Sequence, residues 1–228
     1  MEAESTIAGA AIPPDRTMLE AMQSQRGEPT DPVQERAAFI DAMSRAAAGV
    51  TVVATAGETG RFGQTVSAMC SVSADPPLLL VCINRKSQTC TAISHYRVFS
   101  VNVLRADQER VSQVFAGRPR PGQGQAYDFG CAVWEQAVTG SPLLVGAVAQ
   151  FDCELEATHE AGTHRIFIGR IVASSSSAGT PLLYAHRGYG ELLLFPRHRP
   201  DWRSVPAGFV GDQPDEAFDD LWDTEDWG

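Results

Sequence analysis

The chain has 228 residues, 43% of them hydrophobic and 8% aromatic, which suits one soluble globular domain with appendages. Its formal net charge is −10, but residues 211–228 hold eight Asp and Glu and no Lys or Arg, so the rest is nearly neutral and a nucleic-acid footprint is not expected. No run approaches the roughly 20 apolar residues of a membrane span and the N-terminus has no signal-peptide pattern, so we expect a cytoplasmic protein that does not bind membranes.

The cysteines and histidines give no sign of a metal or redox centre. The five cysteines are odd in number, form no C-x-x-C pair and fall mainly in apolar runs, where a free thiol acts as a small hydrophobe. The five histidines are dispersed, without the spacing of metal ligands. We therefore expect no metal site.

The first part of the chain predicts an arm followed by a helix. Residues 1–30 mix Pro, Gly and polar residues without a period, and we interpret them as a mobile arm. A helix then begins after Asp31, which can cap it, and Gly49 can end it. Its predicted apolar face consists of Phe39, Ile40, Met43 and Ala47.

From residue 50 onward the pattern is typical of short strands. Residues 50–56 and 61–68 flank a Gly-bounded hairpin turn, and the continuous apolar run 76–83 predicts a strand buried on both faces. Residues 87–96 predict a helix and residues 97–104 a strand. A further helix over 107–117 has Asp107 as its expected cap, with Val111, Val114 and Phe115 facing inward.

The second half continues this β pattern after a long loop. Residues 118–130 form a loop of a length that is usually functional when ordered. Long strands are expected over 143–157 and 163–174, a flexible connection over 174–180, and two short strands near 181–185 and 189–195. Six or more strands with a few short helices predict a mainly β fold, a largely antiparallel barrel with peripheral helices.

Common catalytic signatures are absent, so attention falls on residues 65–89. No phosphate loop, strand-linked G-x-G-x-x-G, H-E-x-x-H or G-x-S-x-G occurs. Hydroxyl donors gather instead before the buried strand, and positive charge and a helix N-terminus follow it, which suits a phosphorylated, partly apolar cofactor. The hydroxyl residues are Thr65, Ser67, Ser71 and Ser73, and the residues after the strand are Arg85, Lys86, Ser87 and Thr89. Capping and turn formation explain the same residues equally well.

Two weaker groups lie further along the chain. His164 opens a strand after a Gly-containing turn, where a side chain can project from the rim of a barrel. Arg187 and Tyr189 flank Gly188 near the last strands and suit phosphate or ring contacts, or simply an exposed hairpin turn.

Together these residues resemble the short-chain flavin reductases, the reductase components of two-component flavin-dependent monooxygenases. The resemblance runs from about Phe39 to Leu194 and includes "GVTVVAT", "TVSAMCSVSADPPLLLVCINRKSQT", "FSVNVL", "FAG" and "GTHRIFIGRI". It implies an FMN-binding split barrel over residues 31–198, a homodimer, and hydride transfer from NADH or NADPH to FMN or FAD, with the reduced flavin passed to a partner oxygenase.

The resemblance also implies a role for each candidate residue. Thr65, Val66, Ser67 and Ala68 would line the flavin ring, with further contacts from Ser71 and Ser73. Arg85, Lys86, Ser87 and Thr89 would hold the phosphate. His164 would lie near the nicotinamide, although the preceding residue is Thr163 where the family pattern has Asp. Arg187 and Tyr189 would close over the nucleotide.

Two alternatives remain open at this point. One is a flavin-binding barrel without turnover, acting as a carrier or sensor, and the other is an oxidase related to pyridoxamine-phosphate oxidase, which shares the split barrel. The C-terminal residues 199–228 alternate aromatic residues with carboxylates, a composition that suits either docking to a partner's basic groove or a solvated tail.

Overall fold

The computed structural model describes residues 31–193. The chain separates into two compact units, Met1–Ser44 and Arg45–Gly228, and each is described by itself. The predicted arm over residues 1–30 and the predicted tail over residues 199–228 lie outside the described residues. No helix within residues 31–193 has the length and apolarity needed to cross a membrane.

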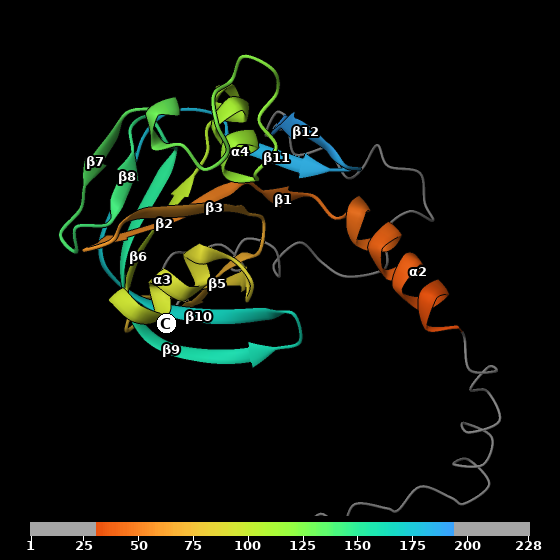
Figure 1. The fold of residues 1–228 in the computed structure, drawn as a ribbon, viewed down its shortest axis with the longest axis horizontal. Coiled ribbons are helices and arrows are strands. Elements are labelled where there is room, and N and C mark those ends of the chain that lie inside the picture. The colour runs from red at the N-terminus through yellow and green to blue at the C-terminus, as the bar shows by residue number, and fades with distance from the viewer. Residues whose placement is uncertain (1–30, 194–228) are drawn as a thin grey trace, which may run out of the picture. The chain divides into compact units, whose positions relative to one another are not determined.

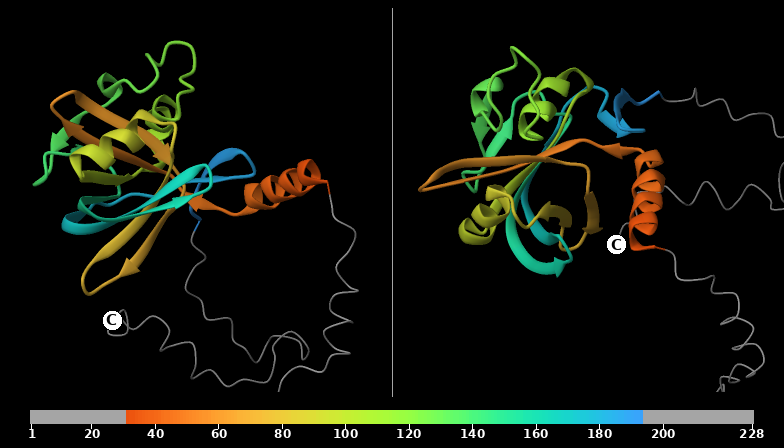
Figure 2. Two further views of the ribbon diagram at one scale, coloured as in Figure 1. Left: turned by 60° about the horizontal axis from the view of Figure 1, so that its bottom comes forward. Right: turned by 45° about the vertical axis from the view of Figure 1, so that its right-hand side comes forward.

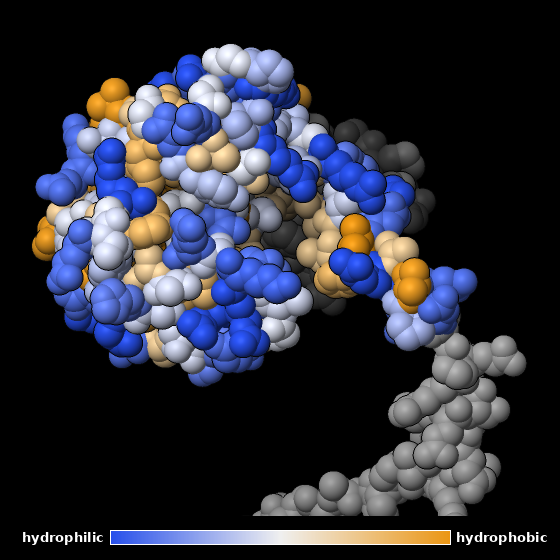
Figure 3. Space-filling view, in the orientation of Figure 1, coloured by the Kyte–Doolittle hydropathy of each residue, from blue (hydrophilic) through white to orange (hydrophobic). Residues whose placement is uncertain are grey.

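The described part of the first unit is mainly one helix, α2 (Pro32–Arg45). The side chain of Asp31 accepts a hydrogen bond from the backbone N–H of Val33 at 3.0 Å, which confirms the predicted cap. No residue of α2 is buried, and Phe39 and Met43 are 65% and 55% exposed. Orange patches on this helix in Figure 3 mark its apolar side chains.

The second unit is built on a seven-stranded antiparallel sheet with the order β3-β2-β6-β9-β10-β5-β4 (Figure 1). Its strands are β2 (Thr51–Gly57), β3 (Gly60–Val66), β4 (Met69–Ser73), β5 (Leu78–Asn84), β6 (Val98–Val103), β9 (Ala149–Ala161) and β10 (His164–Ser176). The views in Figure 2 show how strongly this sheet curves. The mainly β prediction is therefore confirmed.

Smaller elements surround this sheet. A three-stranded sheet has the order β1-β11-β12, and a two-stranded sheet pairs β7 with β8. These strands are β1 (Ala48–Gly49), β7 (Trp134–Gln136), β8 (Pro142–Leu144), β11 (Leu182–Ala185) and β12 (Gly188–Glu191). The helices are α3 (Gln88–Tyr96), α4 (Glu109–Phe115) and the single 3-10 turns η1 (Ala106–Gln108) and η2 (Phe129–Cys131).

Two hydrophobic clusters hold the barrel together, because successive residues of a strand point to opposite faces. Val53 of β2 joins a cluster with Ile93 of α3 and Phe167 of β10. Its neighbour Val52 joins the other cluster, which includes Phe115 of α4. Each of the two longer helices of this unit therefore packs against one of the clusters and is fixed to the sheet.

Strand β5 corrects one prediction. The run 76–83 was expected to be buried on both faces, but burial alternates along β5. Leu79, Val81 and Ile83 are at most 2% exposed, whereas Leu78 and Leu80 are only half-buried. Strand β5 lies next to the edge strand β4, and its second face is only partly covered by the described residues.

The region after residue 142 corrects a second prediction. The single strand expected over 143–157 is broken into β8 and β9. Gly146 has a φ of +80°, a conformation that ends strand pairing and that glycine adopts most easily. Buried Asn102 of β6 accepts a hydrogen bond from the N–H of Leu144 at 2.7 Å, so β8 is held against the main sheet.

Helix α4 confirms its predicted core residues but not its cap. Val111, Val114 and Phe115 are all buried, as their spacing predicts. Asp107 lies instead within η1, where its carboxylate accepts hydrogen bonds from the side chain of Arg105 at 2.7 and 2.9 Å. This ion pair lowers the pKa of Asp107, first through the side-chain hydrogen bond from Arg105.

Candidate functional site

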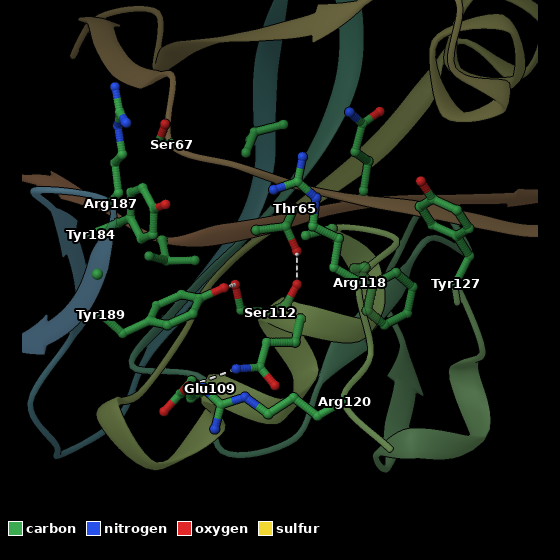
Figure 4. Close-up of a pocket in the computed structure, with 17 residues that line it drawn as sticks. Thr65, Ser67, Glu109, Ser112, Arg118, Arg120, Tyr127, Tyr184, Arg187 and Tyr189 are labelled. Carbon is green, nitrogen blue, oxygen red and sulfur yellow. Dashed lines mark hydrogen bonds and ion pairs between the residues drawn. The ribbon is translucent and has the colours of Figure 1, made fainter. Parts of the chain in front are cut away.

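A cavity of about 710 Å³ opens where the end of β3, helix α4 and the β11–β12 hairpin meet (Figure 4). Thr65 donates its hydroxyl to the carbonyl of Ser112 at 2.8 Å, which fixes the end of β3 to α4. Of the four residues predicted to line a flavin ring, Thr65, Val66 and Ser67 line this cavity and Ala68 does not. The cavity therefore combines hydroxyl groups with an apolar strand end.

The β11–β12 hairpin forms the opposite wall of this cavity. Its two-residue turn, His186 and Arg187, has φ values of +50° and +61°, the backbone of a type I′ turn. The hydroxyl of Tyr189 lies 2.9 Å from the hydroxyl of Ser112, and its ring packs edge-on against Tyr184. The predicted residues Arg187 and Tyr189 thus line the same cavity as Thr65.

A second cavity of about 350 Å³ lies at the N-terminus of α3. Ser87 caps this helix by accepting a hydrogen bond from the N–H of Cys90 at 3.1 Å. Lys86, Ser87 and Thr89 line the cavity, as predicted for a phosphate site, together with Arg61 of β3. A helix N-terminus beside two cations is a favourable environment for a phosphate.

Arg61 is a residue of this second cavity that the sequence did not reveal. Its guanidinium carbon lies 4.7 Å from the ring centroid of Phe129. It has no ion pair with another described residue, so its charge is available to a ligand. The predicted cation Arg85 is used differently: its Nε lies 2.8 Å from Glu160 on β9, and it does not line the cavity.

Gln64 and Tyr127 line both cavities, so the two cavities adjoin each other. Gln64 precedes Thr65 on β3, and Tyr127 lies in the predicted loop 118–130. The side-chain oxygen of Gln64 is buried and has no hydrogen-bond partner among the described residues. A buried acceptor of this kind indicates that a ligand with hydroxyl or amide donors belongs between the two cavities.

Besides Ala68 and Arg85, three more predicted site residues lie outside both cavities. Ser71 and Ser73 are on the edge strand β4. His164 is exposed at the tip of the β9–β10 hairpin, where it pairs with Asn84 at the end of β5. Its Nδ1 lies 2.9 Å from the hydroxyl of Thr163, so this threonine contacts the ring at the position where the family pattern has Asp.

Helix α4 and the loop after it supply cavity residues that belong to no sequence motif. These are Glu109, Ser112 and Gln113 of the helix and Arg118, Arg120 and Tyr127 of the loop 118–130, which stood out only by its length. Ser112 and Gln113 are buried positions of a short helix, and ordinary packing explains their pattern equally well. Only the tertiary fold shows that they face the end of β3.

Comparison with known proteins agrees with this geometry. A family model described as a flavin reductase like domain matches residues 43–193. This chain belongs to the flavin reductase family. The FMN reductase (NADH) RutF of Ancylobacter novellus is 39% identical over 168 residues, which cover 73% of this chain and 91% of that protein.

Solved structures confirm the split-barrel fold of this family member. The NADH:FAD oxidoreductase SgcE6 of Streptomyces globisporus C-1027, in complex with NAD and FAD fragments, is 28% identical with a TM-score of 0.63 and covers 76% of this chain and 99% of its own. The styrene monooxygenase flavin reductase of Pseudomonas putida S12 is 29% identical with a TM-score of 0.60, covering 69% and 99%.

Proposed function

We propose that this flavin reductase family member oxidises NADH or NADPH and reduces FMN or FAD by hydride transfer. The observation that carries this function is the pair of adjoining cavities, of which the cationic one lies at a helix N-terminus and the larger one is lined by hydroxyls and aromatic rings. A flavin has a phosphate, a hydroxyl-bearing ribityl chain and an apolar ring system in the same order.

The residues along the site match the parts of a flavin in spatial order, from the phosphate to the ring. Lys86, Ser87 and Thr89, with Arg61, would hold the phosphate in the smaller cavity. The unpartnered oxygen of Gln64 would accept a hydrogen bond from a ribityl hydroxyl at the junction. The end of β3, Thr65 to Ser67, would lie against the ring.

The bound flavin and nicotinamide supply the hydride chemistry, and the protein binds and orients them. This division fits the described residues, which line the cavities with hydrogen-bonding and cationic side chains. The role of the chain is therefore to bind both nucleotides and to exclude water from the ring.

Steady-state assays with each pair of NADH or NADPH and FMN or FAD test this function. The proposal predicts turnover that saturates in one nucleotide and one flavin, measured as the loss of reduced nicotinamide absorbance. Tight flavin binding without oxidation of either nucleotide would favour the flavin carrier or sensor instead.

Replacing His164 with alanine is expected to raise the KM for NADH or lower the rate of flavin reduction by about tenfold, the effect of losing one hydrogen bond to a bound ligand. The dissociation constant for flavin should not change, since His164 lies outside both cavities. Stopped-flow reduction and flavin titration measure the two quantities. His159→Ala, on the same hairpin and also exposed, is the matched control. Equal kinetics for His164→Ala and wild type would remove this residue from the site.

We further propose that the reduced flavin leaves for a separate flavin-dependent monooxygenase. The support is the kinship with the styrene monooxygenase flavin reductase, named above as the reductase of an oxygenase system. Addition of an oxygenase that takes up reduced flavin should yield oxygenated product only when the reductase turns over. Product formation that does not depend on reductase turnover would contradict this partner.

We also infer that the chain forms a homodimer in which a second copy covers α2. A 14-residue helix is marginal in water without tertiary packing, and α2 has no buried residue within the described chain. Light scattering is expected to give twice the mass of the chain for the wild type, and a lower mass for the double variant Phe39→Glu, Met43→Glu. A monomeric wild type at all concentrations would contradict the dimer. The cytoplasmic location stays a prediction.

A further inference from the structure

A chain of polar side chains lies at the α4 end of the larger cavity. Nη2 of Arg120 donates to Oε1 of Glu109 at 2.7 Å, and Nε2 of Gln113 donates to the same carboxylate oxygen at 2.6 Å. All three residues line the cavity, and Figure 4 shows Glu109 and Arg120 on the side of α4 away from Arg187. The carboxylate of Glu109 therefore holds the amide of Gln113 in one orientation.

This orientation leaves the side-chain amide oxygen of Gln113, Oε1, without a partner. The side chain is 6% exposed, and Oε1 is buried with no hydrogen bond to any described residue. The amide gains nothing by turning over, because that would place its oxygen against the carboxylate of Glu109. A buried acceptor left unpaired costs about 1–3 kcal/mol, so the site favours a ligand that offers an N–H or O–H donor here.

The cation next to Gln113 indicates what else that ligand carries. The backbone N–H of Arg118 donates to the backbone carbonyl of Gln113 at 2.9 Å, so the two residues are linked. The guanidinium of Arg118 lines the cavity but makes no ion pair or side-chain hydrogen bond with another residue of the range 31–193. A hydrogen-bond donor and a phosphate on one ligand would satisfy both groups.

The flavin is already accounted for elsewhere in the site. Its phosphate and ribityl chain match the smaller cavity and Gln64, and its ring system offers a single N–H donor. A nicotinamide dinucleotide combines a carboxamide NH₂ and ribose hydroxyls with a diphosphate. We propose that Gln113 binds the hydride donor by accepting a hydrogen bond from its carboxamide or ribose, and that Glu109 is a positioning residue that fixes the amide of Gln113.

This inference rests on the proposed function. Substitution of two glutamines, one at a time, distinguishes an effect on NADH binding from an effect on flavin binding. Gln113→Met keeps the length and helix propensity of the side chain but removes the acceptor. Its dissociation constant and KM for NADH are expected to rise about tenfold, with flavin affinity unchanged. Gln64→Met should do the opposite, weakening flavin and sparing NADH. The change in NADH fluorescence on binding to the flavin-free protein gives a readout that is independent of turnover.

A second variant keeps the test valid if Gln113→Met disturbs α4. In the double variant Glu109→Gln, Gln113→Glu the hydrogen bond between the two side chains is reversed, and residue 113 keeps an acceptor oxygen that is not used in that bond. NADH affinity is expected to return to within about threefold of wild type, a difference below 1 kcal/mol. Thermal unfolding of each variant shows whether the fold is retained.

The outcomes are distinct. An unchanged NADH dissociation constant in Gln113→Met, or a weakened flavin in place of NADH, would overturn the assignment of Gln113 while wild-type turnover still supported the reductase. Absence of wild-type turnover and of NADH binding would overturn both proposals. Loss of NADH affinity in Gln113→Met, with flavin affinity kept and recovery in the double variant, would support the inference.

Discussion

Lys86→Ala is expected to weaken FMN binding about tenfold and to leave riboflavin binding unchanged. Lys86 lines the smaller cavity beside the N-terminus of α3, where the phosphate would lie. One charge-assisted contact to an exposed phosphate contributes about 1.4 kcal/mol, which is a tenfold change in the dissociation constant. Because riboflavin has no phosphate, its affinity should not depend on this charge. Arg61→Ala should behave in the same way.

Fluorescence titration of both flavins with each variant measures this difference. Arg170→Ala is the matched control, since Arg170 is an exposed arginine that pairs with Glu154 and lines neither cavity. Lys86 is the only lysine in the chain, so amine-directed labelling provides a second test. FMN should protect Lys86 from the reagent, and riboflavin should protect it less. Equal losses of FMN and riboflavin affinity would place the phosphate elsewhere.

Asn102→Leu is expected to lower the free energy of unfolding by about 3 kcal/mol. Asn102 is fully buried, its Nδ2 donates to the carbonyl of Val52 at 3.1 Å, and its Oδ1 accepts from the N–H of Leu144. Leucine has a similar volume but leaves the N–H of Leu144 buried without its partner, at about 1–3 kcal/mol, and removes the side-chain hydrogen bond to Val52, at about 0.5–1.5 kcal/mol. The loss is large because one side chain joins β2, β6 and β8.

Urea unfolding followed by circular dichroism measures this change. Gln136→Leu is the control, because Gln136 is an exposed residue of β7 and its replacement should change stability by less than about 0.5 kcal/mol. A loss below 1 kcal/mol for Asn102→Leu would contradict this account, because the N–H of Leu144 would then have another partner in the folded variant.

The strands and helices could largely be predicted because local patterns specify them. Alternating or continuous apolar runs predicted most of the strands, and Ser87, a typical N-cap residue, indicated the start of α3. The break between β8 and β9 could not be predicted in the same way. It depends on the backbone of Gly146 and on Asn102, which lies more than 40 residues earlier and binds Leu144 only in the folded barrel.

The same distinction between local motifs and tertiary contacts applies to the candidate site. Thr65, Ser67, Lys86 and Ser87 lie in contiguous motifs, so the resemblance to a family found them before the fold was known. Arg85 belongs to the same motif, yet the pairing of β10 with β5 brings it to Glu160 and not into the cavity.

Residues brought in by packing alone escaped prediction. Arg61 belongs to no motif of the sequence, but it lies on β3 with Gln64 and lines the smaller cavity. Gln113 reaches the larger cavity because Ser112 beside it is joined to Thr65. These contacts span about 50 positions of sequence and have no local pattern.

The most direct test of the central claim is anaerobic mixing of the protein and FMN with NADH or NADPH, followed by the visible absorbance of the flavin. The proposed site predicts protein-dependent bleaching that slows when the transferred hydrogen of the nicotinamide is replaced by deuterium. Tight FMN binding with no bleaching by either nucleotide would contradict a flavin reductase and leave a barrel that only binds flavin.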